Sequence, residues 1–309
     1  MTSFIKAYVP EKTVKMEYMI GNFPHVSTMY PVAGDTTVMG SGRIPELQKI
    51  FTNASLPTFK YVKVHTGTTL HFANLKMEVL MTTEDHAPFR ITNSNDTNTV
   101  TKWTISSTDA TSGSITPSTI SSDNSKTTWT LLGDSCIYAS RWLCAMWGGK
   151  TYNASTDHYD GGYIKSDMVQ LAHHGNIGCE VALYKTIQAS IVWFPHNAGT
   201  YNTYTQNGNN GWTGTVDNYG VNNSDVKYVV VAGSWLSNSA NGYGAYSTDS
   251  ITVDFNANGI YFPASGNPAW GIKYNKSDST YTILNIAYNT KQSSSHNITR
   301  VYSSPVIKK

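Results

Sequence analysis

Alternating apolar and polar residues predict several strands in the first half of the chain. Residues 14–20, "VKMEYMI", place their apolar side chains on one face, which is typical of a half-buried strand. Residues 60–83 are expected to form a strand, a turn at Thr66–Gly67 and then a further strand or hairpin. Two more strands are predicted at residues 99–107 and 127–134.

The middle of the chain changes to a pattern in which helices and strands alternate. Residues 135–149 have apolar side chains at helical spacing and end in two glycines, and residues 179–188 also favour a helix. Short apolar runs at 167–175 and 189–197 favour buried strands. The order from residue 126 to residue 197 is therefore strand, helix, strand, helix, strand, which indicates an α/β arrangement with parallel strands.

The rest of the chain is predicted to be β-rich. Residues 226–234, "VKYVVVAGS", favour a buried strand, residues 250–262 a hairpin, and residues 270–290 further strands. We expect one α/β domain over residues 1–260 with a long insertion at 198–225, followed by a β-rich extension at 261–309.

Composition suggests an exported protein. Only 14% of the 309 residues are charged, against about 25% in ordinary globular proteins, and Ser, Thr, Asn and Gly take their place. This composition predicts an extracellular or cell-surface location, although the first 20 residues lack the pattern of a signal peptide. We also expect no membrane-spanning segment.

Charge and cysteine content argue against a nucleic-acid-binding protein and against a disulfide-rich fold. The net charge of +2 and the scattered lysines give no sign of a nucleic-acid-binding surface. The three cysteines, Cys136, Cys144 and Cys179, are too few for a disulfide framework. Cys136 and Cys144 could form a disulfide, or all three could be buried thiols.

Polar residues follow three of the predicted strands. Asp134 ends the strand at 127–134, His173 and His174 follow the next, and His196 ends the third. In open α/β sheets ligands bind at the carboxyl ends of the strands, and carboxylates and imidazoles suit zinc, manganese or iron. Taken singly, Asp134 also fits a helix cap and the histidines fit ordinary turn residues.

These positions carry a resemblance to a known family. The stretch Asp167–Asn176, "DMVQLAHHGN", is very similar to the D-x-L-x-V-x-H-H-G-S motif of the metallo-β-lactamase fold. The chain also has "LLGDS" at Leu131–Ser135, and "NSNDTNTVTKW" at Asn93–Trp103 in place of the family's asparagine-rich stretch. The closest version belongs to the C-terminal domain of the DNA-internalisation competence protein and its free-standing hydrolase relatives. The likeness covers residues 60–200 and extends to 226–260.

The resemblance implies an αββα sandwich with one or two zinc or manganese ions that hydrolyses a phosphodiester or a related ester. Asp134 would be the bridging carboxylate and His173 the later histidine ligand. His174 would be a neighbouring ligand or a proton donor that contacts the substrate. His196 would be a further metal ligand, and Asn98 would orient the substrate or a water molecule.

One hallmark of the fold is missing. The H-x-H-x-D-H segment is not found, because the early histidines, which are His25, His65, His71 and His86, lack its spacing. The first 20 residues resemble the helix and strand that follow this segment in the family. We therefore expect a sandwich incomplete on its N-terminal side, with the first ligands and any signal peptide upstream. Weak metal binding and little activity would follow, and an exposed sheet edge would favour homo-oligomers.

Two other functions remain open. Tyr201, Tyr204 and Trp212 lie in the polar stretch "YNTYTQNGNNGW", where exposed rings could stack on sugars of a cell wall. The same stretch also fits a long solvated loop. The chain could also be an inactive structural remnant of the hydrolase fold. The substrate is not fixed, because nucleotides, nucleic acids, lipid headgroups and lactam-like amides all occur across this fold.

Overall fold

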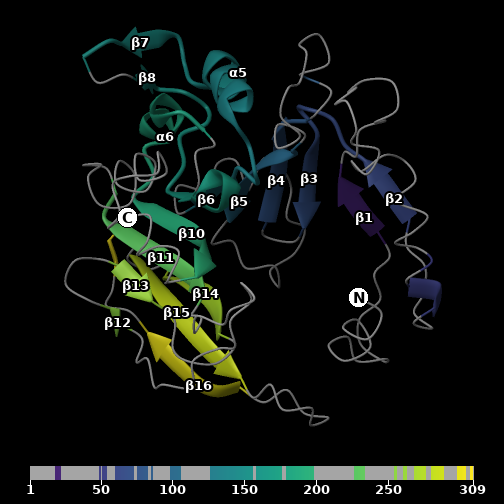
Figure 1. Cartoon of the computed structure of the whole chain (residues 1–309), viewed down its shortest axis with the longest axis vertical. Helices are drawn as coiled ribbons and strands as arrows, with labels where there is room; N and C mark the ends of the chain where they lie inside the picture. Colours follow the sequence, from purple (N-terminus) through teal and green to yellow (C-terminus); the bar gives the residue numbers. More distant parts are fainter. Residues whose placement is uncertain are drawn as a thin grey trace, which may run out of the picture.

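Nine strands form one mixed sheet in the computed structural model, in the order β12-β13-β11-β10-β9-β6-β5-β4-β3 (Figure 1). The structure describes residues 18–21, 49, 51–53, 60–72, 75–82, 85, 98–105, 126–155, 158–175, 179–197, 226–233, 254–255, 260–262, 268–275, 280–288, 298–303 and 307–308. The strands of the sheet are β3 (Thr69–Phe72), β4 (Leu75–Met81), β5 (Val100–Ile105), β6 (Thr127–Leu131), β9 (Met168–Gln170), β10 (Ile191–Asn197), β11 (Tyr228–Gly233), β12 (Asp254–Phe255) and β13 (Ile260–Phe262).

The sheet is antiparallel on one side and parallel in the middle. Strands β3 to β6 pair antiparallel, whereas β6, β9, β10, β11 and β13 pair parallel. The connections between β6, β9 and β10 contain α5 (Ile137–Trp147) and α6 (Val181–Ile187). The predicted alternation of strands and helices, with parallel strands, is therefore confirmed. The small hairpin of β7 (Thr151–Asn153) and β8 (His158–Asp160) was not predicted.

The two helices cover one face of this sheet. Leu143 of α5 and Leu183 of α6 are fully buried in the main core, where they pack with Val192 and Phe194 of β10. The Trp147 Nε1 donates to the backbone oxygen of Leu80, 2.7 Å away, and so ties the end of α5 to β4. Burial of these apolar side chains supplies most of the stabilisation of this layer.

A second sheet meets the other face. Its antiparallel strands are β14 (Pro268–Asn275), β15 (Thr280–Tyr288), β16 (Ile298–Ser303) and β17 (Ile307–Lys308). Ile283 of β15 is buried in a second cluster with Met168, Ile191, Trp193 and Val230. Successive residues of β10 from Ile191 to Phe194 thus face opposite layers, which is why this part of the strand is continuously apolar. The described residues form a mixed α/β structure of helices, a mixed sheet and an antiparallel sheet.

Other expectations have mixed outcomes. The hairpin at 250–262 is confirmed by the antiparallel pairing of β12 with β13, and strands are confirmed within 270–290. The three cysteines are free and buried, so Cys136 and Cys144 form no disulfide. Of the strand predicted at 14–20, residues from Tyr18 onward form β1 (Tyr18–Gly21), which pairs parallel with β2 (Lys60–Lys63). No helix in the described ranges is long and apolar enough to cross a membrane.

Some expectations fall outside the described residues. The insertion expected at 198–225 lies outside them. So do its candidate sugar-binding side chains, which are Tyr201, Tyr204 and Trp212. The early histidines His25 and His86 also lie there.

Candidate functional site

The ends of β6, β9 and β10 bring three candidate residues to the same edge of the sheet. Asp134 follows β6, His174 follows β9, and His196 is the penultimate residue of β10. His174 Nε2 lies 3.6 Å from Asp134 Oδ1. The ring of His196 meets the ring of His174 edge-on, with 5.7 Å between their centroids. Parallel pairing explains this meeting, because it places the carboxyl ends of all three strands side by side.

The two histidines adopt an unusual backbone conformation. His173 has φ 50° and ψ 46°, and His174 has φ 59° and ψ 25°. Both are left-handed, a region that costs a residue with a Cβ atom about 1–2 kcal/mol. Gly175 continues the left-handed turn with φ +80°, and a Cβ there would lie 2.2 Å from Phe194 Cε2. The glycine of the His-His-Gly sequence is therefore required both by its φ angle and by the Phe194 ring. Strain of this kind persists where surrounding contacts hold it, often at functional sites.

A carbonyl group of β10 orients the ring of His174. Its Nδ1 lies 3.4 Å from the backbone oxygen of Pro195. A carbonyl only accepts hydrogen bonds, so this contact favours the hydrogen on Nδ1 and leaves the Nε2 lone pair toward Asp134. Two acceptors then face each other, and a cation between them, either a proton or a metal ion, would satisfy both. Histidine ligands of metals commonly use their second nitrogen in this way.

The neighbouring side chains differ in burial. Burial first, and then the nearby His174, lower the pKa of His196, which favours the neutral imidazole that a metal ligand requires. The side chains of His174 and Asp134 are 53% and 45% exposed. As a simple ion pair they would contribute little to stability, typically below about 1 kcal/mol. The strained turn is therefore not explained by the strength of this pair.

The two remaining predicted residues lie close by but in other roles. His173 is half-buried, and its backbone nitrogen donates to the oxygen of Gly133, 2.9 Å away. A Cβ atom on Gly133 would lie 3.0 Å from Asn98 Oδ1, so Asn98 packs directly against the Gly133–Asp134 turn. The structure thus sets His174 rather than His173 against Asp134.

Asp134 is not the cap of α5. The N-cap residue is Cys136, and no side chain forms a capping hydrogen bond there. The carboxylate of Asp134 is therefore available for the contact with His174. The alternative that Asp134 simply caps the following helix is wrong.

Two supporting residues were missed in the sequence. The side chain of Gln170 accepts from the backbone nitrogen of Gly133 at 3.0 Å and donates to the oxygen of Leu171 at 2.8 Å, so it links the two strand ends. The buried hydroxyl of Tyr184 accepts from the backbone nitrogen of Ala172 at 3.0 Å and holds the start of the histidine turn. The alternation of β9 places Gln170 at the partly exposed position, but only the structure gives its partners.

The chemistry of the donor set fits one divalent ion held by two protein ligands. Two ligands of a tetrahedral zinc ion, each at about 2.1 Å, are about 3.4 Å apart, close to the 3.6 Å between Asp134 Oδ1 and His174 Nε2. Within the described residues, however, no three His, Cys, Asp or Glu side chains group as a metal site. A catalytic zinc site normally has three protein ligands, so this pair alone predicts weak binding.

Known proteins supply no further guide to the family. No protein-family model, curated protein or solved structure matches the chain. The resemblance to the metallo-β-lactamase fold therefore rests on the motifs of the sequence.

Proposed function

We propose that the chain is a metal-dependent hydrolase of the metallo-β-lactamase kind, and that its described residues provide one part of the metal site. The observation that carries the proposal is the contact of His174 Nε2 with Asp134 Oδ1 at 3.6 Å, with Nδ1 turned to a backbone carbonyl. Both groups are partly exposed, so an ion and a substrate could reach them from solution.

Different residues of the chain would bind the metal, hold a proton and position the ligands. Asp134 and His174 bind zinc or manganese, and the neutral His196 lies beside His174, ready to be a further ligand or to hold a proton. His173 and Asn98 fix the turns that carry the ligands. A bound ion would supply Lewis-acid activation of a phosphodiester or a related ester. Because the described residues bring together two ligands in place of a full set, we expect little or no hydrolase activity.

Calorimetric titration with zinc tests the proposal. We expect weak binding of one ion, lost in Asp134→Ala and in His174→Ala. His71→Ala is the matched control, because His71 is exposed on β3, away from this edge, and should leave binding unchanged. Hydrolysis of a chromogenic phosphodiester by the same samples should stay near the background rate.

Two results would overturn the proposal in different ways. A tight two-metal isotherm that Asp134→Ala abolishes would show a complete site and contradict the expectation of weak activity. Equal zinc binding in the wild type and both variants would show that the metal does not bind at this edge of the sheet.

A further inference from the structure

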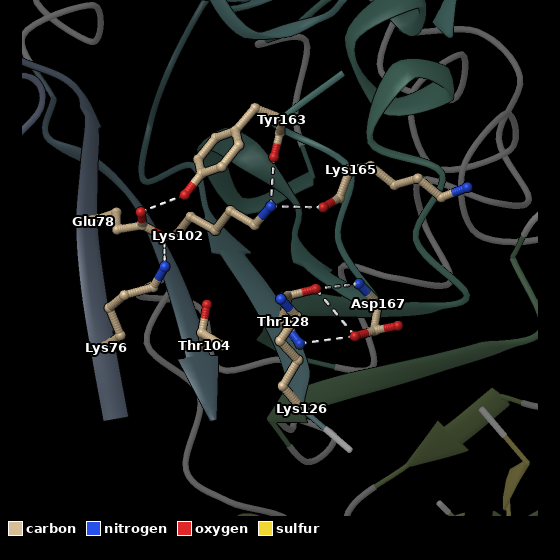
Figure 2. Close-up of a pocket in the computed structure, with 9 residues that line it drawn as sticks. All are labelled: Lys76, Glu78, Lys102, Thr104, Lys126, Thr128, Tyr163, Lys165 and Asp167. Carbon is tan, nitrogen blue, oxygen red and sulfur yellow. Dashed lines mark hydrogen bonds and ion pairs between the residues drawn. The ribbon is translucent and has the colours of Figure 1, made fainter. Parts of the chain in front are cut away.

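A separate pocket lies on the helix-covered face, where β6 and β9 begin, at the opposite end of these strands from Asp134 and His174. Its volume is about 460 Å³, within the roughly 300–1,000 Å³ of sites for small ligands. Figure 2 shows the residues that line it, which are Lys76, Glu78, Lys102, Thr104, Lys126, Thr128, Tyr163, Lys165 and Asp167.

Strand register builds the floor of the pocket. Lys76 of β4 lies opposite Thr104 of β5, which in turn lies opposite Thr128 of β6. Their side chains therefore share one face of the sheet in neighbouring rows. Figure 2 shows Thr104 between Lys76 and Thr128.

The wall of the pocket is held by a buried lysine. Lys102, 7% exposed, donates from Nζ to the backbone oxygens of Tyr163 and Lys165, the latter 2.9 Å away. The Tyr163 hydroxyl donates to Glu78 on the opposite side. These contacts fix the loop at residues 163–165 against the sheet, so the pocket is already formed without a ligand.

The charge of the lining favours an anion. The lining contains four lysines and two carboxylates, although the side chain of Lys165 points away from the recess in Figure 2. Both carboxylates already contact protein groups. Glu78 pairs with Lys76, whose Nζ is 3.1 Å from Oε2. Asp167 Oδ2 accepts from the backbone nitrogen of Thr128 at 2.8 Å and from its hydroxyl at 3.1 Å. A recess lined by excess positive charge concentrates anions.

Thr104 supplies a hydroxyl to the lining of the pocket. Thr104 is 3% exposed, and no described residue forms a hydrogen bond with its side chain. Beside it, the Lys76 ammonium has three donors and lies 3.1 Å from one oxygen of Glu78. A bound oxyanion would accept hydrogen bonds from both groups.

We propose that this pocket binds a small organic anion through a carboxylate or phosphate group, with Thr104 and Lys76 as its donors. The pocket is independent of the proposed metal site, because it shares no residue with the Asp134–His174 edge. Its ligand would fill the recess above Thr104 and Thr128.

Calorimetry on the full chain, without divalent cations, tests this site with two probes, citrate for carboxylates and pyrophosphate for phosphates. We expect saturable binding of at least one of them, which also identifies the anionic group. Thr104→Val should weaken it about tenfold by removing one hydrogen bond to a charged group. Lys76→Met should weaken it at least as much.

Two controls separate ligand binding from structural effects. Lys150→Met removes an exposed lysine outside the pocket and should leave affinity unchanged. Thr104→Val keeps the side-chain shape, so its unfolding midpoint should not fall. Loss of affinity in Asp134→Ala would contradict the independence of the two sites. The proposal is overturned if neither probe binds, or if both bind equally well to Thr104→Val and Lys76→Met.

Discussion

Raising the pH should stabilise this protein, because Lys102 is buried as a cation. Its side chain is 7% exposed, and burial, opposed by the nearby Glu78, lowers its pKa from 10.5 to about 8. Between these two values the unfolded chain binds more protons than the folded one, so the stability rises with pH. The destabilisation is fully present below pH 8 and disappears as the pH approaches 10.5. At about 1.4 kcal/mol per pH unit, the full effect is about 3 kcal/mol, of which about 2 kcal/mol falls between pH 7 and 9.5.

Urea unfolding at several pH values from 7 to 9.5 measures this effect, with Lys102→Met as the reference. The free energy of unfolding of the wild type should rise by about 2 kcal/mol relative to the variant. The range stops at pH 9.5 because burial and a hydrogen bond to Glu78 raise the pKa of Tyr163 above its ordinary 10.0, and stability is lost as the pH rises above that value. If the free energy of unfolding changed equally with pH in the wild type and in Lys102→Met, the reasoning that Lys102 is charged and buried would be refuted.

Two further predictions concern the histidine turn. Gly175→Ala should lower the free energy of unfolding by at least about 2 kcal/mol in urea, because its Cβ would lie 2.2 Å from the Phe194 ring in a left-handed conformation. Gly67→Ala, with φ +88° and no atom within 4 Å of the new Cβ, isolates the cost of the φ angle alone, and an equal loss there would contradict a role for Phe194. His174→Gly should raise the free energy of unfolding by about 1 kcal/mol by relieving strain at φ 59°, while abolishing zinc binding. A stability loss in this variant would show that the imidazole is held for packing rather than for a ligand.

Much of the fold follows from local patterns in the sequence. Apolar periodicity predicts α5, α6 and most strands of the large sheet, since each of these elements buries a regular face. The hairpin at residues 151–160 was missed because its strands have only three residues each, too few to show a regular alternation. The layers could not be predicted, since which sheet packs on β10 depends on contacts between distant residues such as Ile283 and Trp193.

The candidate site was only partly accessible from sequence. The strand ends predict that Asp134, the two histidines and His196 lie near one another. The choice between His173 and His174 depends on two consecutive left-handed residues, a conformation that local propensity disfavours. Contacts between distant residues accompany it, such as the packing of Gly175 on Phe194 and the bond of Tyr184 to Ala172. Lys102 was also missed, although it shares the buried alternation of Val100 and Thr104 in β5.

The most direct test of the account is the imidazole nitrogen spectrum of ¹⁵N-labelled protein during zinc addition. The central claim is that Asp134 and His174 ligate one divalent ion, with His174 Nδ1 kept on the Pro195 carbonyl. The account predicts that His174 Nε2 shifts as zinc is added, that Nδ1 stays protonated, and that Asp134→Ala removes the shift. A shift at His174 Nδ1 in place of Nε2, or an unchanged His174 in the presence of bound zinc, would contradict it.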